Sequence, residues 1–149
     1  MPTIAELMRP DVPLLSAQCT LEEASRAFER SGIESLPLCD PQGVLLGIVD
    51  RSDISRAFKA LGELANSLRA QHLMHPDAPS IGIHDTVEKA MAEMGIHQTR
   101  YLPVLAGSTV QGMLTSADIA HAGPRVRIEE LIEHVSFPED RSISTPRAS

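Results

Sequence analysis

The chain has 149 residues, of which 42% are hydrophobic and only 3% aromatic, and its net charge is −7. A globular chain of this length buries about 70% of its unfolded surface, so an aliphatic core can hold it together without disulfides. No basic block favours nucleic-acid binding, and no apolar run reaches the ~20 residues of a membrane span. Residues 1–8 lack the features of a signal peptide. We therefore expect a soluble, cytoplasmic protein that binds neither nucleic acid nor membranes.

The first part of the chain predicts a mixture of short helices and strands. Pro10 stops a lead-in helix, Thr20 is a typical residue for the cap of the next helix, and Gly32 is typical of its end. We expect a lead-in helix at residues 4–8, an extended segment at 13–15 and a helix at 21–31. Two hairpin strands follow at residues 35–39 and 44–49, and a second helix at 52–68.

The same order of elements is expected again further along the chain. We expect the extended segment at residues 79–83 and the helix at 87–94. The two strands follow at residues 101–105 and 109–114, and the last helix starts at residue 116. Gly123-Pro124 breaks the pattern. Residues 123–136 then predict an amphipathic helix, and residues 137–149 a disordered tail.

Matching residues show that these two parts are an internal repeat. The matches, in register apart from one residue lost in a turn, are Leu7-Met8 with Leu73-Met74, Thr20 with Thr86, Leu36-Pro37 with Leu102-Pro103, Gly47 with Gly112, and Asp53-Ile54 with Asp118-Ile119. The sequence therefore predicts two repeats, at residues 4–62 and 63–122.

Each repeat contains a buried strand followed directly by a polar helix start, at residues 47–54 and 112–119. In the second copy Thr115 and Asp118 allow two interpretations. They are a helix cap, because Thr-x-x-Asp is close to a capping box. Alternatively, the helix start binds a phosphate and the carboxylate binds the hydroxyls of a ribose.

Taken together, the repeated motifs resemble a tandem pair of CBS domains. They are Thr20-Leu21-Glu22-Glu23-Ala24, Leu36-Pro37-Leu38, Gly43, residues 47–54, Thr86-Val87, Ala90, Leu102-Pro103-Val104 and residues 112–119. The resemblance implies an α/β fold of two β-α-β-β-α repeats around a pseudo-two-fold axis. It also implies a non-enzymatic regulatory module that binds an adenosine nucleotide (AMP, ADP, ATP or S-adenosylmethionine) between the repeats and signals to a protein partner.

In such pairs each nucleotide site combines an aspartate from one repeat with residues from the other. The resemblance therefore implies one site formed by Thr115, Ser116 and Asp118 with Pro13, Leu14, Cys19, Ser35 and Leu36. It implies a second site formed by Asp53 with Pro79, Ser80, Arg100 and Tyr101. It implies no catalytic residue, no metal ligand and no required cofactor.

The first repeat departs from the family pattern at Asp50, where Ser or Thr is usual. A carboxylate there is expected to cap the helix. It should also repel a phosphate by about 1 to 4 kcal/mol at contact, unless Arg51 or Arg100 compensates. We therefore expect the Asp118 site to be the better phosphate site.

Other residues give weaker signals. Cys19 and Cys39 are interpreted as small buried hydrophobes rather than a redox pair. His72 and His75 have the spacing of a shared helix face, but Pro76 follows at once and no metal site is predicted. No nucleophile elbow or Gly-rich phosphate loop occurs, which disfavours an enzyme.

Two expectations concern partners. The apolar helix faces at residues 21–28 and 87–94 should be exposed and pair in a homodimer. The alternative to nucleotide sensing is a structural interaction module that binds no physiological nucleotide.

Overall fold

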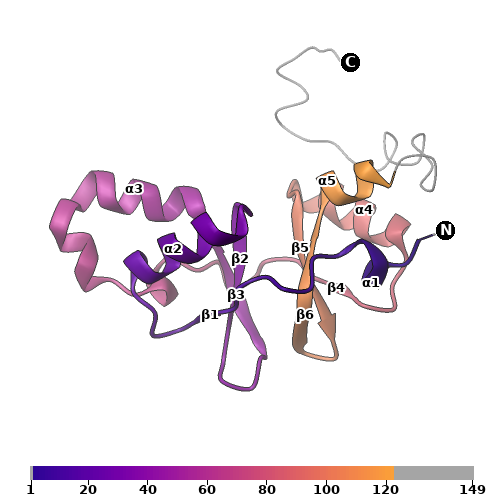
Figure 1. The fold of residues 1–149 in the computed structure, drawn as a ribbon, viewed down its shortest axis with the longest axis horizontal. Coiled ribbons are helices and arrows are strands. Elements are labelled where there is room, and N and C mark those ends of the chain that lie inside the picture. Colours follow the sequence, from indigo (N-terminus) through magenta and orange to yellow (C-terminus); the bar gives the residue numbers. More distant parts are fainter. Residues whose placement is uncertain (1, 123–149) are drawn as a thin grey trace, which may run out of the picture. The chain divides into compact units, whose positions relative to one another are not determined.

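The structure, a computed structural model, describes residues 2–122 and contains two three-stranded sheets, ordered β1-β2-β3 and β4-β5-β6 (Figure 1). In the first repeat the elements are α1 (Ile4–Leu7), β1 (Leu15–Ser16), α2 (Leu21–Ser31), β2 (Ser35–Cys39), β3 (Leu45–Asp50) and α3 (Arg51–Leu61), and the 3-10 helix η1 (Gly62–Ser67) crosses the boundary to the second repeat. In the second they are η2 (Ala70–His72), β4 (Ile81–Gly82), α4 (Val87–His97), β5 (Tyr101–Ala106), β6 (Thr109–Thr115) and α5 (Ser116–His121). The predicted helix 123–136 and tail 137–149 lie outside the described residues.

Local sequence signals explain where α2 begins and ends. The Thr20 hydroxyl accepts the Glu23 N–H at 3.0 Å, and the Glu23 carboxylate accepts the Thr20 N–H at 2.8 Å. This reciprocal capping box satisfies two backbone donors at the helix start. Gly32 ends the helix in the left-handed conformation, with φ of 71°, which glycine adopts without a steric penalty. The expected bounds of α2 are therefore confirmed.

The predicted helix from Ser52 through Leu68 is too long. Helix α3 ends at Leu61, and the chain continues as the 3-10 helix η1. Gly62 causes the break, because it adopts a φ of 58° and glycine is a poor residue for a helix interior. The apolar spacing continued past this glycine, so periodicity alone did not reveal it.

The described residues form two compact units that do not coincide with the two repeats. One unit contains residues 2–10, 79–106 and 111–122, and the other contains residues 11–78 and 107–110. The segment that leads into each repeat, residues 2–10 in the first and residues 63–78 in the second, therefore lies in the unit that holds the sheet of the other repeat. We call these two segments the lead-ins and this arrangement the lead-in exchange. Ile4, for example, is completely buried in a core with residues of α4, β5 and α5.

Each lead-in is attached by a matching pair of backbone hydrogen bonds. Arg9 exchanges two with Met113 of β6, at 2.8 and 3.0 Å, and His75 exchanges two with Ile48 of β3, at 2.7 and 3.1 Å. The glycines of the repeated motif allow this close approach. A Cβ at Gly112 would lie 2.5 Å from the Arg9 carbonyl oxygen, and one at Gly47 would lie 2.8 Å from that of His75.

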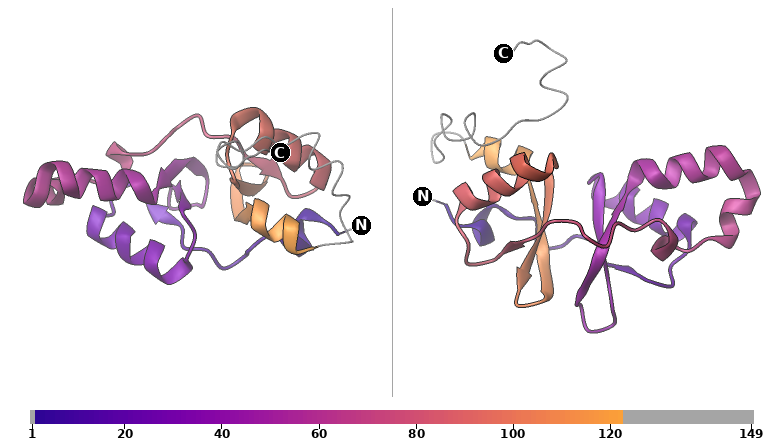
Figure 2. Two further views of the ribbon diagram at one scale, coloured as in Figure 1. Left: turned by 90° about the horizontal axis from the view of Figure 1, so that it is seen from above. Right: turned by 180° about the vertical axis from the view of Figure 1, so that it is seen from behind.

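The apolar helix faces expected to pair in a dimer are instead buried inside their own units. In α2 the buried residues are Leu21, Ala24, Ala27 and Phe28; in α4 they are Val87, Ala90, Met91 and Met94. Helix α2 lies beside α3 and contacts η1, and α4 contacts α5 and β5 (Figure 2). The prediction that these faces are exposed is therefore wrong, because neighbouring elements of the same unit cover them.

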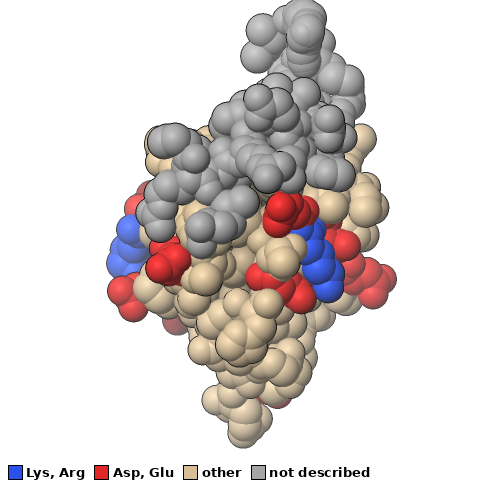
Figure 3. All heavy atoms as spheres, turned by 90° about the vertical axis from the view of Figure 1, so that its right-hand side faces the viewer, with Lys and Arg blue, Asp and Glu red and all other residues tan. Residues whose placement is uncertain are grey.

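Charged side chains of both signs share the described surface. On the face shown in Figure 3, the Lys and Arg atoms lie next to Asp and Glu atoms and do not gather into a basic patch. Among residues 2–122, every helix is too short or too polar to cross a bilayer.

Candidate functional site

The start of α5 follows strand β6 directly and is capped by Thr115. This residue is 4% exposed, and its hydroxyl accepts the N–H of Asp118 at 3.0 Å. The capping interpretation of Thr115 is thus confirmed. A hydroxyl that accepts one hydrogen bond still carries its own hydrogen, so capping does not remove its capacity to donate to a ligand.

Asp118 forms an ion pair with Arg9 of the lead-in. Arg9 Nε lies 3.2 Å from Asp118 Oδ2; the aspartate side chain is 17% exposed and the arginine side chain 44%. Arg9 was missed as a site residue in the sequence. The available signal was its position in the repeat. Arg9 follows Leu7-Met8 just as His75 follows the matching Leu73-Met74 in the second repeat.

Other predicted site residues of this unit lie at the start of α5 or at the N-terminal ends of strands β4 and β5. The Ser116 N–H donates to the Arg100 carbonyl oxygen at 2.9 Å, which ties α5 to the residue before β5. Tyr101 is the first residue of β5 and is half-buried. Pro79 and Ser80, also half-buried, precede β4.

The start of α3 differs from that of α5. Asp50 occupies the cap position but makes no capping hydrogen bond, so the expectation that this carboxylate caps the helix is wrong. Its Oδ1 instead accepts a hydrogen bond of 2.5 Å from the Ser35 hydroxyl. Arg51, expected to compensate the charge of Asp50, pairs with Glu34 at 3.3 Å.

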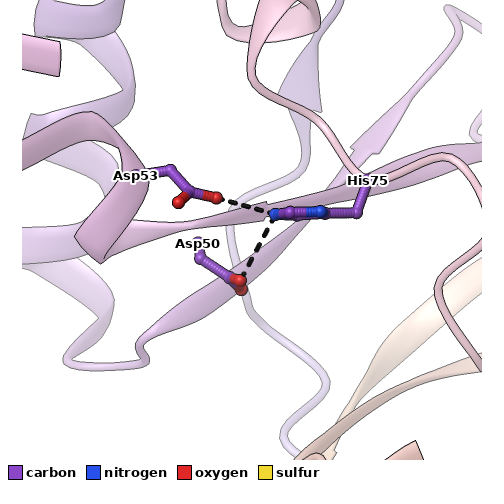
Figure 4. A group of neighbouring side chains, drawn as sticks. All are labelled: Asp50, Asp53 and His75. Atoms are coloured by element: carbon purple, nitrogen blue, oxygen red, sulfur yellow. Dashed lines mark hydrogen bonds and ion pairs between the residues drawn. The ribbon is translucent and has the colours of Figure 1, made fainter. Parts of the chain in front are cut away.

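Three side chains converge at this helix start: Asp50, Asp53 and His75 (Figure 4). The Nε2 atom of His75 lies 2.7 Å from Asp53 Oδ2 and 3.6 Å from Asp50 Oδ2. The other oxygen of Asp53 pairs with Arg56. Sequence reasoning missed this group because His75 is distant in sequence and reaches α3 only through the lead-in exchange.

The remaining predicted residues of the first repeat have varied surroundings. Leu36 is completely buried, whereas Leu14 is 46% exposed. Cys19 and Cys39 are both free thiols. Burial raises the pKa of the Cys19 thiol, and burial with the nearby Asp40 carboxylate raises that of Cys39 to about 11.

Each predicted nucleotide site draws on residues of both units, and its assembly remains a prediction. Within one unit the structure brings together Thr115, Ser116, Asp118 and Arg9. Within the other it brings together Ser35, Asp50, Asp53 and His75.

Comparison with known proteins decides the family. The family model for the CBS domain matches twice, over residues 4–60 and 70–125. The chain belongs to the CBS-domain family. Proteins built from CBS domains are generally regulatory rather than catalytic. The tandem resemblance inferred from the repeat is therefore confirmed, and the two CBS matches cover most of the chain.

One curated relative of this CBS protein is hypoxic response protein 1 of Mycobacterium tuberculosis, which is 25% identical over 138 residues, 93% of this chain and 96% of the relative. A crystal structure of Hypoxic Response Protein I with two coordinated zinc ions has a TM-score of 0.73 and 26% identity, covering 83% of this chain and all of that one.

Two further solved structures share the fold of this CBS protein at lower identity. CBSX2 in complex with AMP has a TM-score of 0.70 and 20% identity, covering 84% of this chain and 98% of that one. The CBS domain pair of MJ0100 in complex with 5′-methylthioadenosine and S-adenosyl-L-methionine has a TM-score of 0.67 and 22% identity. The match covers 82% of this chain and 95% of that one.

Proposed function

We propose that this CBS protein is a regulatory module that binds an adenosine-containing ligand and signals the bound state to a partner protein. The family assignment supports a regulatory role, and CBS pairs of the same fold bind AMP, or 5′-methylthioadenosine and S-adenosylmethionine. The observation that carries the proposal for this chain is the partly buried Asp118, paired with Arg9 beside the capped start of α5.

The chemistry of these side chains fits the two polar ends of a nucleoside phosphate. The Asp118 carboxylate can only accept hydrogen bonds when ionised, and a ribose offers two hydroxyl donors. The Arg9 guanidinium has a planar set of donors that matches phosphate oxygens. On ligand binding Asp118 would exchange Arg9 for the ribose, which would leave Arg9 to bind the phosphate. The Thr115 hydroxyl would add a neutral donor.

The matching position in the first repeat is less suited to phosphate. Asp50 adds a second carboxylate close to Asp53, and neither can donate when ionised. The ligand proposal therefore concerns Asp118 first, and AMP is the simplest probe because it has one phosphate.

Calorimetric titration of AMP into the full chain, with EDTA present, tests the proposal. Asp118→Ala should weaken binding by about 10- to 150-fold, the equivalent of about 1.5 to 3 kcal/mol for lost charge-assisted hydrogen bonds. Asp53→Ala is the matched control and should weaken it less. Thermal unfolding of both variants separates a loss of binding from a loss of fold. A lower melting temperature with unchanged affinity would leave Asp118 only a structural role, through its ion pair with Arg9.

The alternative function is a structural interaction module without a physiological nucleotide. It would be supported if AMP, ADP, ATP and S-adenosylmethionine all failed to bind the intact chain. We also propose a homodimer, because symmetric pairing is the most common way to form an oligomer. Light scattering at micromolar concentration tests it, and a monomer would contradict it.

A further inference from the structure

We propose that Asp50, Asp53 and His75 bind a divalent transition-metal ion of the zinc class. One oxygen of each carboxylate and one imidazole nitrogen all lie within 4.8 Å of one another. Magnesium and calcium prefer oxygen ligands alone, whereas a mixed set of carboxylates and imidazole suits zinc and neighbouring ions. The inference does not rest on the proposed nucleotide function at Asp118, because Asp50, Asp53 and His75 lie in the other unit and would take a different ligand.

The distances from His75 to the two carboxylates fit coordination after a small adjustment. Zinc bonds of about 2.0 to 2.2 Å place neighbouring tetrahedral ligands about 3.4 Å apart. His75 Nε2 and Asp50 Oδ2 are 3.6 Å apart, close to that spacing. His75 Nε2 and Asp53 Oδ2 are 2.7 Å apart, the length of a hydrogen bond. A metal ion would replace the proton shared by this pair, and the two side chains would separate by about 0.7 Å.

Atoms outside the group hold the ligands in position. The oxygen of Asp50 that faces away from His75 accepts the Ser35 hydroxyl, and the corresponding oxygen of Asp53 pairs with Arg56. The backbone of His75 is fixed to Ile48 by two hydrogen bonds. Such outer contacts orient metal ligands and raise metal affinity. With the His75 side chain 55% exposed and Asp50 39% exposed, an ion can reach the group from solvent.

The orientation of Asp50 is not explained by the stability of its helix. An aspartate before a helix normally caps it and stabilises it by about 1 kcal/mol. Asp50 has the extended backbone of a cap residue, but its side chain makes no capping bond and turns one oxygen toward His75 instead. The side chain thus gives up its usual structural role and contributes a third donor beside Asp53 and His75.

The second repeat shows the same backbone without the donor set. Thr115 stands at the position of Asp50, and Arg9 at the position of His75. Because arginine remains protonated in proteins, it cannot supply a lone pair to a metal. Within residues 2–122, no second group of three such side chains meets the same distance criterion.

Calorimetric titration of ZnCl₂ into the full chain, without nucleotide, tests the site. Asp53→Asn and His75→Gln should each weaken zinc binding by more than about 100-fold, since even outer contacts are worth about 10- to 100-fold. Ser35→Ala, which removes only an outer contact, should weaken it by about 10-fold. His97→Gln is the matched control: His97 also pairs with a carboxylate, Glu93, at 3.3 Å, but lacks a second one. It should bind zinc like the parent chain.

Cobalt gives a second measurement that needs no variant. Co²⁺ bound by oxygen and nitrogen ligands should show visible bands without the strong near-ultraviolet absorption of a cobalt–thiolate bond. Thiolate absorption would assign the metal to a cysteine and overturn the proposal, as would equal zinc binding by His75→Gln and His97→Gln. Because this titration contains no nucleotide and the AMP titration contains EDTA, failure of either proposal can be told from failure of the other.

Discussion

The starts of α3 and α5 occupy matching positions in the two repeats, and their side chains differ in charge and in use. Thr115 caps its helix, and the neighbouring Asp118 is neutralised by the permanent charge of Arg9. Asp50 leaves its helix uncapped and lies with Asp53 near His75, whose charge depends on protonation. The repeated backbone therefore fixes where these side chains stand, while single substitutions decide which ligand each place suits.

Exchanging the cap residues should exchange the phosphate preference. In Thr115→Asp, an added carboxylate should weaken AMP binding by about 1 to 4 kcal/mol, roughly 5- to 1000-fold. Asp50→Thr should strengthen AMP binding or add a second binding event. Calorimetry measures both. If both variants bind AMP as the parent does, phosphate is not held at either helix start.

Replacing either glycine of the repeated motif, Gly112 or Gly47, with alanine should lower the stability of the fold, and the loss should be larger at Gly112. Gly112→Ala should destabilise the fold by about 2 to 3 kcal/mol and Gly47→Ala by about 1 to 2, because both crowd a backbone oxygen. The order follows from the contact distances, 2.5 Å for the Arg9 carbonyl and 2.8 Å for that of His75. Denaturant unfolding measures the difference. Gly107, whose added Cβ would meet nothing within 4 Å but whose φ is 65°, offers a control for backbone strain alone.

Because Thr115 caps its helix and Asp50 does not, substitutions at these two positions should change the free energy of unfolding by different amounts. Thr115→Val removes the capping hydroxyl and should lower the free energy of unfolding by about 1 kcal/mol. Asp50→Asn keeps an acceptor for the Ser35 hydroxyl and loses no cap, so we expect a change within about 0.5 kcal/mol in metal-free buffer. Equal losses in thermal or denaturant unfolding would show that Asp50 supports its helix after all.

The smallest expected effect concerns the residues before α2 and α4. Cys19 and Asp85 occupy matching positions, and the Asp85 carboxylate accepts the Gly82 N–H at 2.8 Å, which lowers the pKa of Asp85. Because the folded state favours the ionised form, this stabilisation is complete above the ordinary pKa of aspartate and is lost as the pH falls through the lower folded value. Cys19 has no such effect in that range. A carbon-detected NMR titration should give Asp85 a midpoint below the ordinary pKa of aspartate, and a midpoint at or above that ordinary value would contradict the assigned hydrogen bond.

Elements whose signals are local could be predicted from the sequence. Thr20, Glu23 and Gly32 set the bounds of α2, and the repeat located matching strands to within about one residue of β2, β3, β5 and β6. The end of α3 was missed because the apolar spacing continues past Gly62. The cap at Thr115 was identified, since its donor is only three residues away.

Interactions that depend on the lead-in exchange could not be predicted. Arg9 meets Asp118, and His75 meets Asp53, because each lead-in pairs with a strand of the other repeat. The matching of Arg9 with His75 is visible in the sequence, but the partner of each is not. The same exchange buries Ile4 in a core made of residues from the second repeat. The repeat pattern grouped Ile4 with residues 4–62 and gave no sign of this.

The lead-in exchange also sets the order in which the chain acquires its structure during synthesis. Residues 11–78 contain most of one unit, so most of it is complete before the strands of the other unit are made. Arg9, by contrast, must wait for a partner 109 positions further along the chain. At about 5 to 20 residues per second, that interval lasts roughly 5 to 20 s. During it the apolar Ile4 lacks the α4, β5 and α5 residues of its core. A segment that is synthesised before both sheets is therefore among the last to find its place.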